Sequence, residues 1–453
     1  NFPAGAEMKI AWRMGDMPGC IRFSLTTAES PAALSMDYGA VLALQQPETQ
    51  RTAQESAALF TAWRKSIPDL SEVNEQIEQT LKSTPQAHTT VLHLTSRSSR
   101  DPRTTSRLDR GEWDQPLEPI QPHVPAALHP LPADAPPNRL GLARWLVSEE
   151  SPLTARVAVN YVWQGLFGSG LVETPEDFGT RSPFPEYRDL LDWLAVDFME
   201  HGWSRRRLMR TIVTSRMYRQ SSSVSPELLD RDAANRLLAR SSRYRVEAEV
   251  LRDIALSVSG LLTSYPGGES IIPPVPQNVL DYNYVYPKFW KPAEGSERYC
   301  RAVYLFRKRS MPDPMLSVLD SPNGDASCPQ RMRSNTPLAA LVGLNEPVLV
   351  EAARALSLRI LKEAQPDDSA RARHGFFLCT SRIPDSREEA ALLTALQQQR
   401  QRIAEGWLNP REVATGNPAT LPEIPSGTTP QDVAAWTLIS RILLNLDETM
   451  TRN

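Results

Sequence analysis

Two rows of polar side chains on apolar helices are the parts of this 453-residue chain best suited to chemistry. The first row recurs every four residues along the apolar segment 152–167 and consists of Arg156, Asn160 and Gln164. The second row lies in segment 246–262 and consists of Glu249, Arg252 and Asp253. Because an unpaired buried charge is costly, we expect the two helices to face each other, with an arginine of one row paired to a carboxylate of the other.

These rows have two interpretations. Ion pairs and hydrogen bonds inside an apolar core commonly fix the register of neighbouring helices, and this is the main interpretation. A ligand site is the alternative, because charges clustered in an apolar setting are also typical of functional sites.

The densest aromatic stretch of the sequence is a second candidate site. Its members are Tyr282, Tyr284, Tyr286, Phe289 and Trp290. Aromatic side chains most often fill the space beneath proline-rich loops, and we favour packing for this reason. As an exposed surface they would stack on sugars or bind a partner.

Metal sites and resident cofactors are not expected. The six histidines form no HxH or HExxH pair, and the cysteines form no CxxC or CxxCH, so neither a zinc site nor a haem attachment motif is present. The acidic loop with Glu173, Glu176 and Asp177 lacks the D-x-D-x-D-G spacing of a calcium site. No GxSxG, P-loop or GxGxxG motif occurs.

Among the four cysteines, we expect one disulfide at most. Cys300 and Cys328 both lie in a loop-rich segment, and we predict a bridge between them. Cys379 follows the apolar run 376–378 and is expected to be a buried, inert thiol.

The elements that position these residues are mostly helices. Apolar periodicity, polar caps, prolines at helix starts and glycines at helix ends predict a mainly α fold. The predicted helices span 49–66, 70–81, 138–148, 152–167, 185–201, 204–218, 246–262, 337–344, 347–362, 369–381, 386–403 and 429–444.

Between the helices, the chain is divided by long proline-rich segments. Residues 101–137 contain nine prolines and are expected to form an extended strap that lies on another surface, anchored by Trp113, Leu117, Ile120 and Val124. Residues 264–333 are a loop-rich insertion in a helical domain that spans 138–453. Residues 31–100 form a helical hairpin segment, and 1–30 end a preceding β-sandwich-like domain with a small hairpin over 7–27.

The sequence indicates neither a nucleic-acid binder nor a membrane-spanning protein. The formal net charge is −3, with 50 basic and 53 acidic side chains, so a nucleic-acid binder is not indicated. No apolar run approaches the roughly 18 residues of a membrane span.

Several segments resemble a known family. They are 138–146, 151–160, 163–174, 177–179, 190–195, 214–222, 331–338 and 444–448. Together with Arg110-Gly-Glu and Pro122-His-Val-Pro-Ala, they resemble the planctomycete-specific C-terminal domain of unknown function, over about 101 to the end of the chain.

This resemblance implies an exported protein of the periplasm or cell envelope. The family's proteins often carry an upstream cytochrome-c-like domain, so haem c would be held by that domain or by a partner and not by this chain. The family has no established reaction, so no catalytic residue is carried over.

Two functions remain as hypotheses. The first is a scaffold that docks protein subunits or a cytochrome-type module and has no reaction of its own. The second is a periplasmic enzyme or binding subunit that acts on a glycan or a similar polar ligand through the polar rows and the aromatic stretch. A scaffold should have its polar rows satisfied and sealed, whereas a ligand site should have them lining an open pocket.

Overall fold

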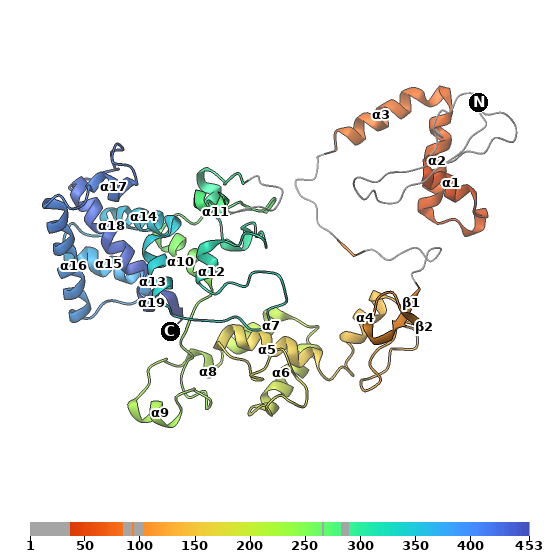
Figure 1. Ribbon diagram of the computed structural model, residues 1–453, viewed down its shortest axis with the longest axis horizontal. Helices are drawn as coiled ribbons and strands as arrows, with labels where there is room; N and C mark the ends of the chain where they lie inside the picture. The colour runs from red at the N-terminus through yellow and green to blue at the C-terminus, as the bar shows by residue number, and fades with distance from the viewer. Residues whose placement is uncertain (1–36, 85–92, 95–103, 265–266, 282–289, 453) are drawn as a thin grey trace. The chain divides into compact units, whose positions relative to one another are not determined.

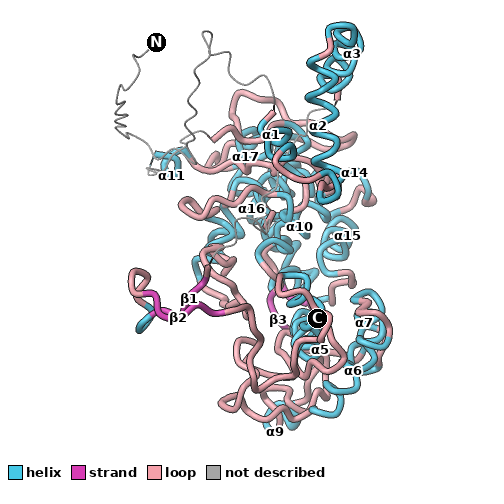
Figure 2. The backbone as a smooth tube through the Cα atoms, turned by 90° about the vertical axis from the view of Figure 1, so that its right-hand side faces the viewer, coloured by secondary structure: helices cyan, strands magenta, loops and turns pink. Residues whose placement is uncertain are grey.

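The computed structural model describes residues 37–84, 93–94, 104–264, 267–281 and 290–452 (Figure 1). The chain divides into two units, 1–90 and 91–453, and each is considered by itself. Helices dominate the described residues and the described strands are short (Figure 2), so the predicted mainly α fold is confirmed. The predicted hairpin over 7–27 lies outside the described residues.

The described part of the first unit is helical. Helix α1 (Tyr38–Leu44) precedes α2 (Ala53–Ser66) and α3 (Ser71–Lys82). The side chains of Thr52 and Glu55 form a capping box that starts α2. No residue of α2 or α3 is buried, and Trp63 is 55% exposed, so the apolar sides of these two helices are not covered by the described residues.

The proline-rich strap differs from its prediction in how it is anchored. Part of it folds on itself, because β1 (Thr105–Leu108) pairs antiparallel with β2 (Pro116–Ile120). Three of the four predicted anchors are exposed, namely Trp113, Leu117 and Ile120, and only Val124 is buried. The observed anchor is His129, which stacks on Trp145 at 4.7 Å and whose carbonyl accepts a hydrogen bond from the Trp145 indole.

A first hydrophobic core forms where α5 (Thr154–Phe167), α6 (Arg188–Glu200) and α7 (Arg205–Val213) meet. Its fully buried side chains include Val159, Trp163, Leu191, Phe198 and Leu208. Helix α5 ends at Gly168, whose φ of 87° is favourable for glycine, as the sequence pattern predicts.

A second and larger core contains the C-terminal helices. It is built by α10 (Ala248–Ser259), α12 (Pro314–Val318), α14 (Pro347–Glu363) and α18 (Pro430–Leu444), with α14 packed along α18 (Figure 1). Its fully buried side chains include Leu356, Ile360, Trp436, Ile439 and Leu443. Prolines 314, 347 and 430 each stand at the start of a helix. An N–H group at this position has no acceptor within the helix, so proline, which lacks the N–H, costs no hydrogen bond there.

Further helices complete the second unit. They are α4 (Arg139–Leu146), α8 (Arg216–Arg219), α9 (Pro226–Arg231), α11 (Gln277–Asp281), α13 (Pro337–Asn345), α15 (Asp368–Thr380), α16 (Ser386–Ala404), α17 (Pro410–Thr415) and α19 (Asp447–Met450). A short antiparallel pair, β3 (Tyr244–Arg245) with β4 (Thr451–Arg452), ties the chain's last described residues to the start of α10.

Candidate functional site

The side chains of the first polar row make their contacts around the core formed by α5, α6 and α7, apart from Gln164, which reaches Pro329. Arg156 donates through Nε to Asp192 of α6 at 2.6 Å and also reaches the carbonyl of Pro152. Asn160 is buried, and its amide group makes bonds of 2.9 Å and 3.1 Å with the backbone of Val172. Arg156 therefore ties α5 to α6, and Asn160 holds the loop after α5 in place, which is the behaviour of a structural network.

The second polar row holds loops against α10. The carboxylate of Glu249 accepts from Arg331 at 2.8 Å, and this hydrogen bond lowers its pKa although burial opposes the shift. Asp253 accepts from the backbone N–H of Ala302 at 2.7 Å and from Arg301 at 3.2 Å.

The predicted pairing between the two rows is wrong. The loop 329–333 provides the contacts between them: the Gln164 amide donates to the carbonyl of Pro329 at 3.4 Å, while Arg331 binds Glu249. Arg333 completes the connection by donating to Gly168 at 3.0 Å and to Glu247 at 2.9 Å. The charge of α5 is therefore paired with Asp192 of α6, and the charges of α10 are paired with loop residues, so the two rows do not pair with each other.

Replacing Arg156 by methionine tests the structural role of the first row. We expect a loss of about 1 kcal/mol in the free energy of unfolding, because the side chains of the ion pair with Asp192 are 36% and 30% exposed and Arg188 remains near that carboxylate. Urea unfolding of both proteins measures the loss. A loss above about 4 kcal/mol would show that the pair behaves as a buried one.

The predicted disulfide is absent, because Cys300 and Cys328 are both free thiols. Cys300 is fully buried in a small apolar cluster, whereas Cys328 is exposed and its thiol contacts the carbonyl of Gln330 at 3.1 Å. Cys379 is buried as predicted. Burial raises the pKa of Cys300 and raises that of Cys379 to about 12.

Thiol labelling checks this assignment. In the native chain we expect Cys328 to react with iodoacetamide while Cys300 and Cys379 stay protected until urea is added, because only the first is accessible. Mass spectrometry of the tryptic peptides gives the rate at each site. A peptide in which Cys300 and Cys328 remain linked before reduction would contradict the structure.

The aromatic stretch is only partly visible. Tyr282, Tyr284, Tyr286 and Phe289 lie outside the described residues. The indole of Trp290 donates to the carbonyl of Pro273 at 2.9 Å, and its ring centre lies 5.9 Å from that of Phe306. Trp290 therefore packs within the loop-rich insertion.

An open pocket of about 400 Å³, here called the central pocket, lies between α10, α12 and α14. Its charged lining residues are Arg252, Arg298, Asp313, Glu346, Glu351 and Arg354. Three guanidinium groups and three carboxyl groups thus face one cavity, which is the arrangement expected of a polar ligand site.

Arg252 is the most buried of these residues, at 4% exposure. It donates to the carbonyl of Cys300 at 2.7 Å and to that of Arg298 at 2.6 Å, and so fixes the loop that carries Arg298. Burial lowers the pKa of Arg252, and Asp253, Asp313 and Glu346 oppose this shift. Arg252 is the member of the predicted cluster that lines the pocket.

Asp313 and Glu346 face the pocket because each caps a helix. Asp313 accepts from the backbone N–H of Leu316 at 3.0 Å at the start of α12. Glu346 accepts from the backbone N–H groups of Val348 at 2.7 Å and Leu349 at 3.3 Å at the start of α14. The two helix starts border the same cavity, so both carboxyl groups line it.

Both carboxyl groups hold protons more tightly than usual. Burial raises the pKa of Asp313, although hydrogen bonds from its own helix oppose the shift. Burial, with help from the charge of Asp313, raises the pKa of Glu346 to about 7, against the lowering effect of the two N–H donors and of Arg252. A carboxyl group with a pKa near neutrality can both donate and accept a proton under ordinary conditions.

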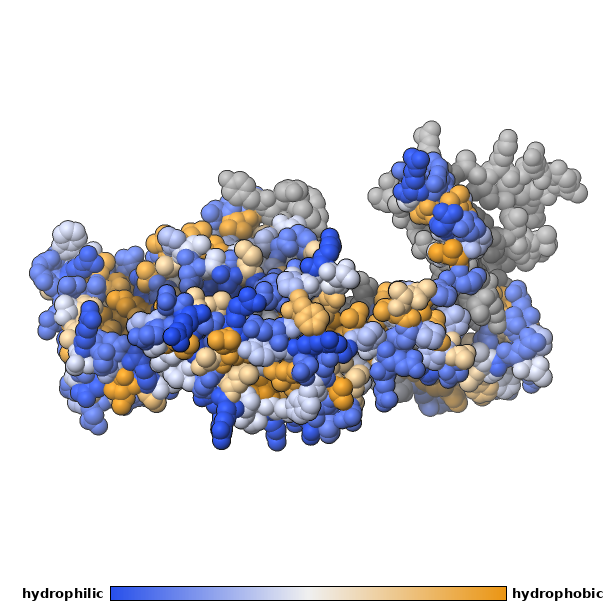
Figure 3. All heavy atoms as spheres, turned by 90° about the horizontal axis from the view of Figure 1, so that it is seen from below, coloured by the Kyte–Doolittle hydropathy of each residue, from blue (hydrophilic) through white to orange (hydrophobic). Residues whose placement is uncertain are grey.

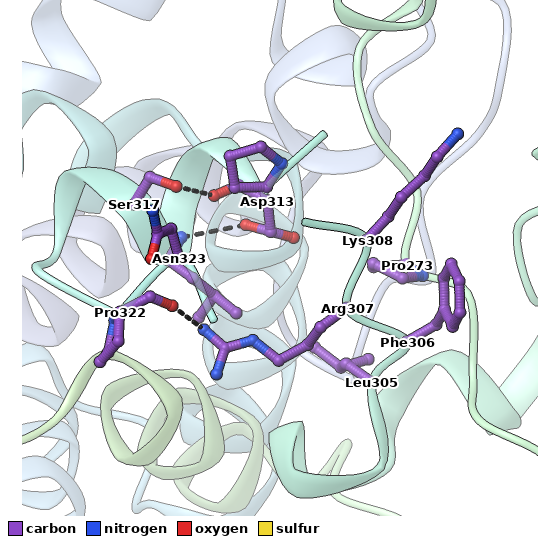
Figure 4. Close-up of a pocket in the computed structure, with 11 residues that line it drawn as sticks. Pro273, Leu305, Phe306, Arg307, Lys308, Asp313, Ser317, Pro322 and Asn323 are labelled. Carbon is purple, nitrogen blue, oxygen red and sulfur yellow. Dashed lines mark hydrogen bonds between the residues drawn. The ribbon is translucent and has the colours of Figure 1, made fainter. Parts of the chain in front are cut away.

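A second, tighter cavity of about 20 Å³ adjoins the central pocket and shares Asp313, Pro273 and Leu316 with it (Figure 4). On its far side, Arg307 donates to the carbonyl of Pro322 at 2.7 Å. The hydroxyl of Ser317 donates to the Asp313 carbonyl at 2.8 Å, a contact within the first turn of α12.

The comparison with protein families identifies this part of the chain. The model of a family described as proteins of unknown function (DUF1553) matches residues 138–396, which is more than half of the chain. The chain belongs to this family. The six charged residues of the central pocket all lie within the matched DUF1553 region. No curated protein and no solved structure matches the chain.

Two kinds of feature are absent from the described residues of this DUF1553 protein. In the part of the chain that the structure describes, no group of three or more histidine, cysteine, aspartate or glutamate side chains is placed to hold a metal. No helix in the described ranges is long and apolar enough to cross a membrane.

Asp313 and Glu346 were not predicted as site residues. Each stands directly before the proline that starts a helix, so both were recognisable as caps but not as members of a site. An acidic side chain in the pair Asp313-Pro314 and again in Glu346-Pro347 is the signal that was available.

Proposed function

We propose that this DUF1553 protein binds a glycan or a similar polar ligand in the central pocket, with Asp313 and Glu346 as the groups that exchange protons with it. The observation that supports this most is the location of both carboxyl groups on one open cavity beside the buried charge of Arg252. One carboxyl can carry a proton while the other is ionised, which is how a carboxyl pair divides the roles of acid and base.

The expected chemistry is general acid–base catalysis. Glu346, with its pKa near 7, would donate a proton to a leaving oxygen, and Asp313 would remain as the base or as a charge that holds the ligand. Arg298 is held by Glu351 and by the hydroxyl of Tyr299 at 2.7 Å, so it can present a fixed donor to a sugar hydroxyl.

A panel of neutral and acidic oligosaccharides, tested by thermal shift and by product analysis, examines the proposal on the full chain. We expect at least one member to raise the melting temperature, and any turnover to fall about 100-fold or more in Asp313→Asn and Glu346→Gln. Both substitutions keep a side-chain oxygen that can cap the helix. Asp367→Asn, which alters the exposed cap of α15, is the matched control. Binding and turnover unaffected by the two pocket variants would contradict the proposal.

A second candidate function is docking, as an exported scaffold for a cytochrome-type module. It is favoured by an open, mainly apolar groove of about 620 Å³ along α5 and α7, which exposes Tyr161 and Met209 and carries Arg205 at its edge. Exposed apolar side chains of this kind interrupt the hydrophilic face shown in Figure 3. An apolar partner face with acidic residues at its rim would complement the groove.

Isolation of the protein from cells that produce it naturally tests the docking function. The wild-type chain should co-purify with a haem-staining protein, and Met209→Asp should lose that protein while keeping its fold. Equal haem staining in both preparations would show that the groove is not the docking face.

A further inference from the structure

One arginine of the central pocket is only partly used by the protein. Arg354 donates through Nε to the carbonyl of Val413 at 3.0 Å. Its Nη1 and Nη2 groups, which are the two remaining donor positions of the guanidinium, bind no acceptor among the described residues. The side chain lines the pocket and is half-buried, so these donors are held in a fixed orientation.

Gly416 makes room for this guanidinium. A Cβ atom on Gly416 would lie 3.0 Å from Nη1 and 3.2 Å from Nη2 of Arg354, and the φ of 84° at this position also disfavours any larger residue. Gly416 itself lines the pocket. The backbone of Gly416, at the end of α17, therefore lies against the planar guanidinium of Arg354 without a side chain that would cover Nη1 and Nη2.

The charge of Arg354 is also uncompensated. The carboxylate that acts on it, Glu351, is bound by Arg298, and Arg441 adds a second positive charge in its surroundings. Burial lowers the pKa of Arg354, but a guanidinium remains protonated in proteins. A planar pair of N–H donors with an unbalanced charge matches a carboxylate or phosphate group, which accepts two parallel hydrogen bonds.

The position of Arg354 relative to Glu346 sets the shape of the ligand. Glu346, Val350 and Arg354 all line the pocket and recur every four residues, so they share one face of α14. Eight residues of helix separate the backbone of Glu346 from that of Arg354, which corresponds to roughly 12 Å. A ligand that reaches both groups is elongated, with the proton-exchanging centre at one end and the charged group at the other.

We propose that the ligand of the central pocket carries an oxyanion, a carboxylate or a phosphate, which Arg354 binds through Nη1 and Nη2. This inference rests on the proposed function and makes the ligand class more specific: an acidic polar molecule, such as a sugar acid or sugar phosphate, and not a neutral sugar.

Calorimetric titration of the full chain at constant ionic strength tests this, with glucuronate, glucose 1-phosphate and glucose as probes. We expect both anionic probes to bind the wild type at least about tenfold more tightly than glucose. Arg354→Met should remove this preference, and Arg354→Lys should keep part of it, because lysine retains the charge but not the two-donor geometry. Lys362→Met removes an exposed cation from the same helix and should change nothing.

The outcomes separate the inference from the proposed function. Anionic probes that bind Arg354→Met as tightly as the wild type would overturn the inference. Equal binding of all three probes to the wild type would also overturn the inference. If that equal binding were lost in Asp313→Asn, the proposed function would be retained, but the ligand would not need an oxyanion. If no member of the glycan panel and none of the three probes binds, both the inference and the proposed function are contradicted. Selective binding of glucuronate or of glucose 1-phosphate identifies which oxyanion the pocket prefers, and either supports the inference.

Discussion

Replacement of Arg252 by methionine is expected to lower the free energy of unfolding by about 3 kcal/mol or more. The methionine would fill much of the buried space, but the carbonyl groups of Cys300 and Arg298 would lose their donors inside the protein. The loop that carries Arg298 would then no longer be fixed to α10. Urea unfolding measures the loss, and circular dichroism checks that the helices persist.

A surface arginine on the neighbouring loop provides the control. The side chain of Arg301 is 64% exposed and pairs with Asp253, so Arg301→Met should cost less than about 1 kcal/mol. If Arg252→Met is equally mild, water must replace the lost donors, and the idea that Arg252 organises the pocket would be wrong.

Glu346→Gln is expected to change how stability depends on pH. The folded protein holds a proton on Glu346 up to about pH 7, whereas the unfolded chain releases it near the ordinary value of 4.5. Between these two values the folded state binds more protons than the unfolded state, so raising the pH destabilises the wild type. The contribution of this group amounts to about 3 kcal/mol, fully present below pH 4.5 and lost as the pH rises to 7.

The glutamine variant lacks this titration while keeping an acceptor for the N–H groups of Val348 and Leu349. The wild type should therefore lose about 3 kcal/mol relative to Glu346→Gln between pH 4.5 and pH 8, as measured by urea unfolding at each pH. Parallel stability curves for the two proteins would mean that Glu346 is ionised throughout this range and cannot act as an acid at neutral pH.

Much of the helical framework was predictable because its signals are local. Proline at the first turn marks the starts of α13 and α14, and glycine at positive φ marks the end of α5, since both depend only on neighbouring backbone. The strap at 101–137 was predicted to be extended, but three of its four predicted anchors are exposed, because the residues that a loop buries depend on distant packing.

The site was harder to predict for the same reason. Arg252 was identified as a polar residue on an apolar helix, whereas its partners are backbone carbonyls 46 and 48 positions away. Arg252 was predicted to pair with carboxylates, because the sequence shows which side chains are charged but not which backbone carbonyls lie nearby. Asp313 and Glu346 come together only because α12 and α14 both begin at the central pocket, a fact that depends on how the second core packs.

The central claim is that a carboxyl group in the central pocket exchanges its proton near neutral pH. Carbon-13 NMR of the protein labelled at glutamate side-chain carboxyl groups measures this directly, with Glu346→Gln to assign the resonance. We expect a midpoint for Glu346 near pH 7. A midpoint at or below the ordinary value of 4.5 would contradict it.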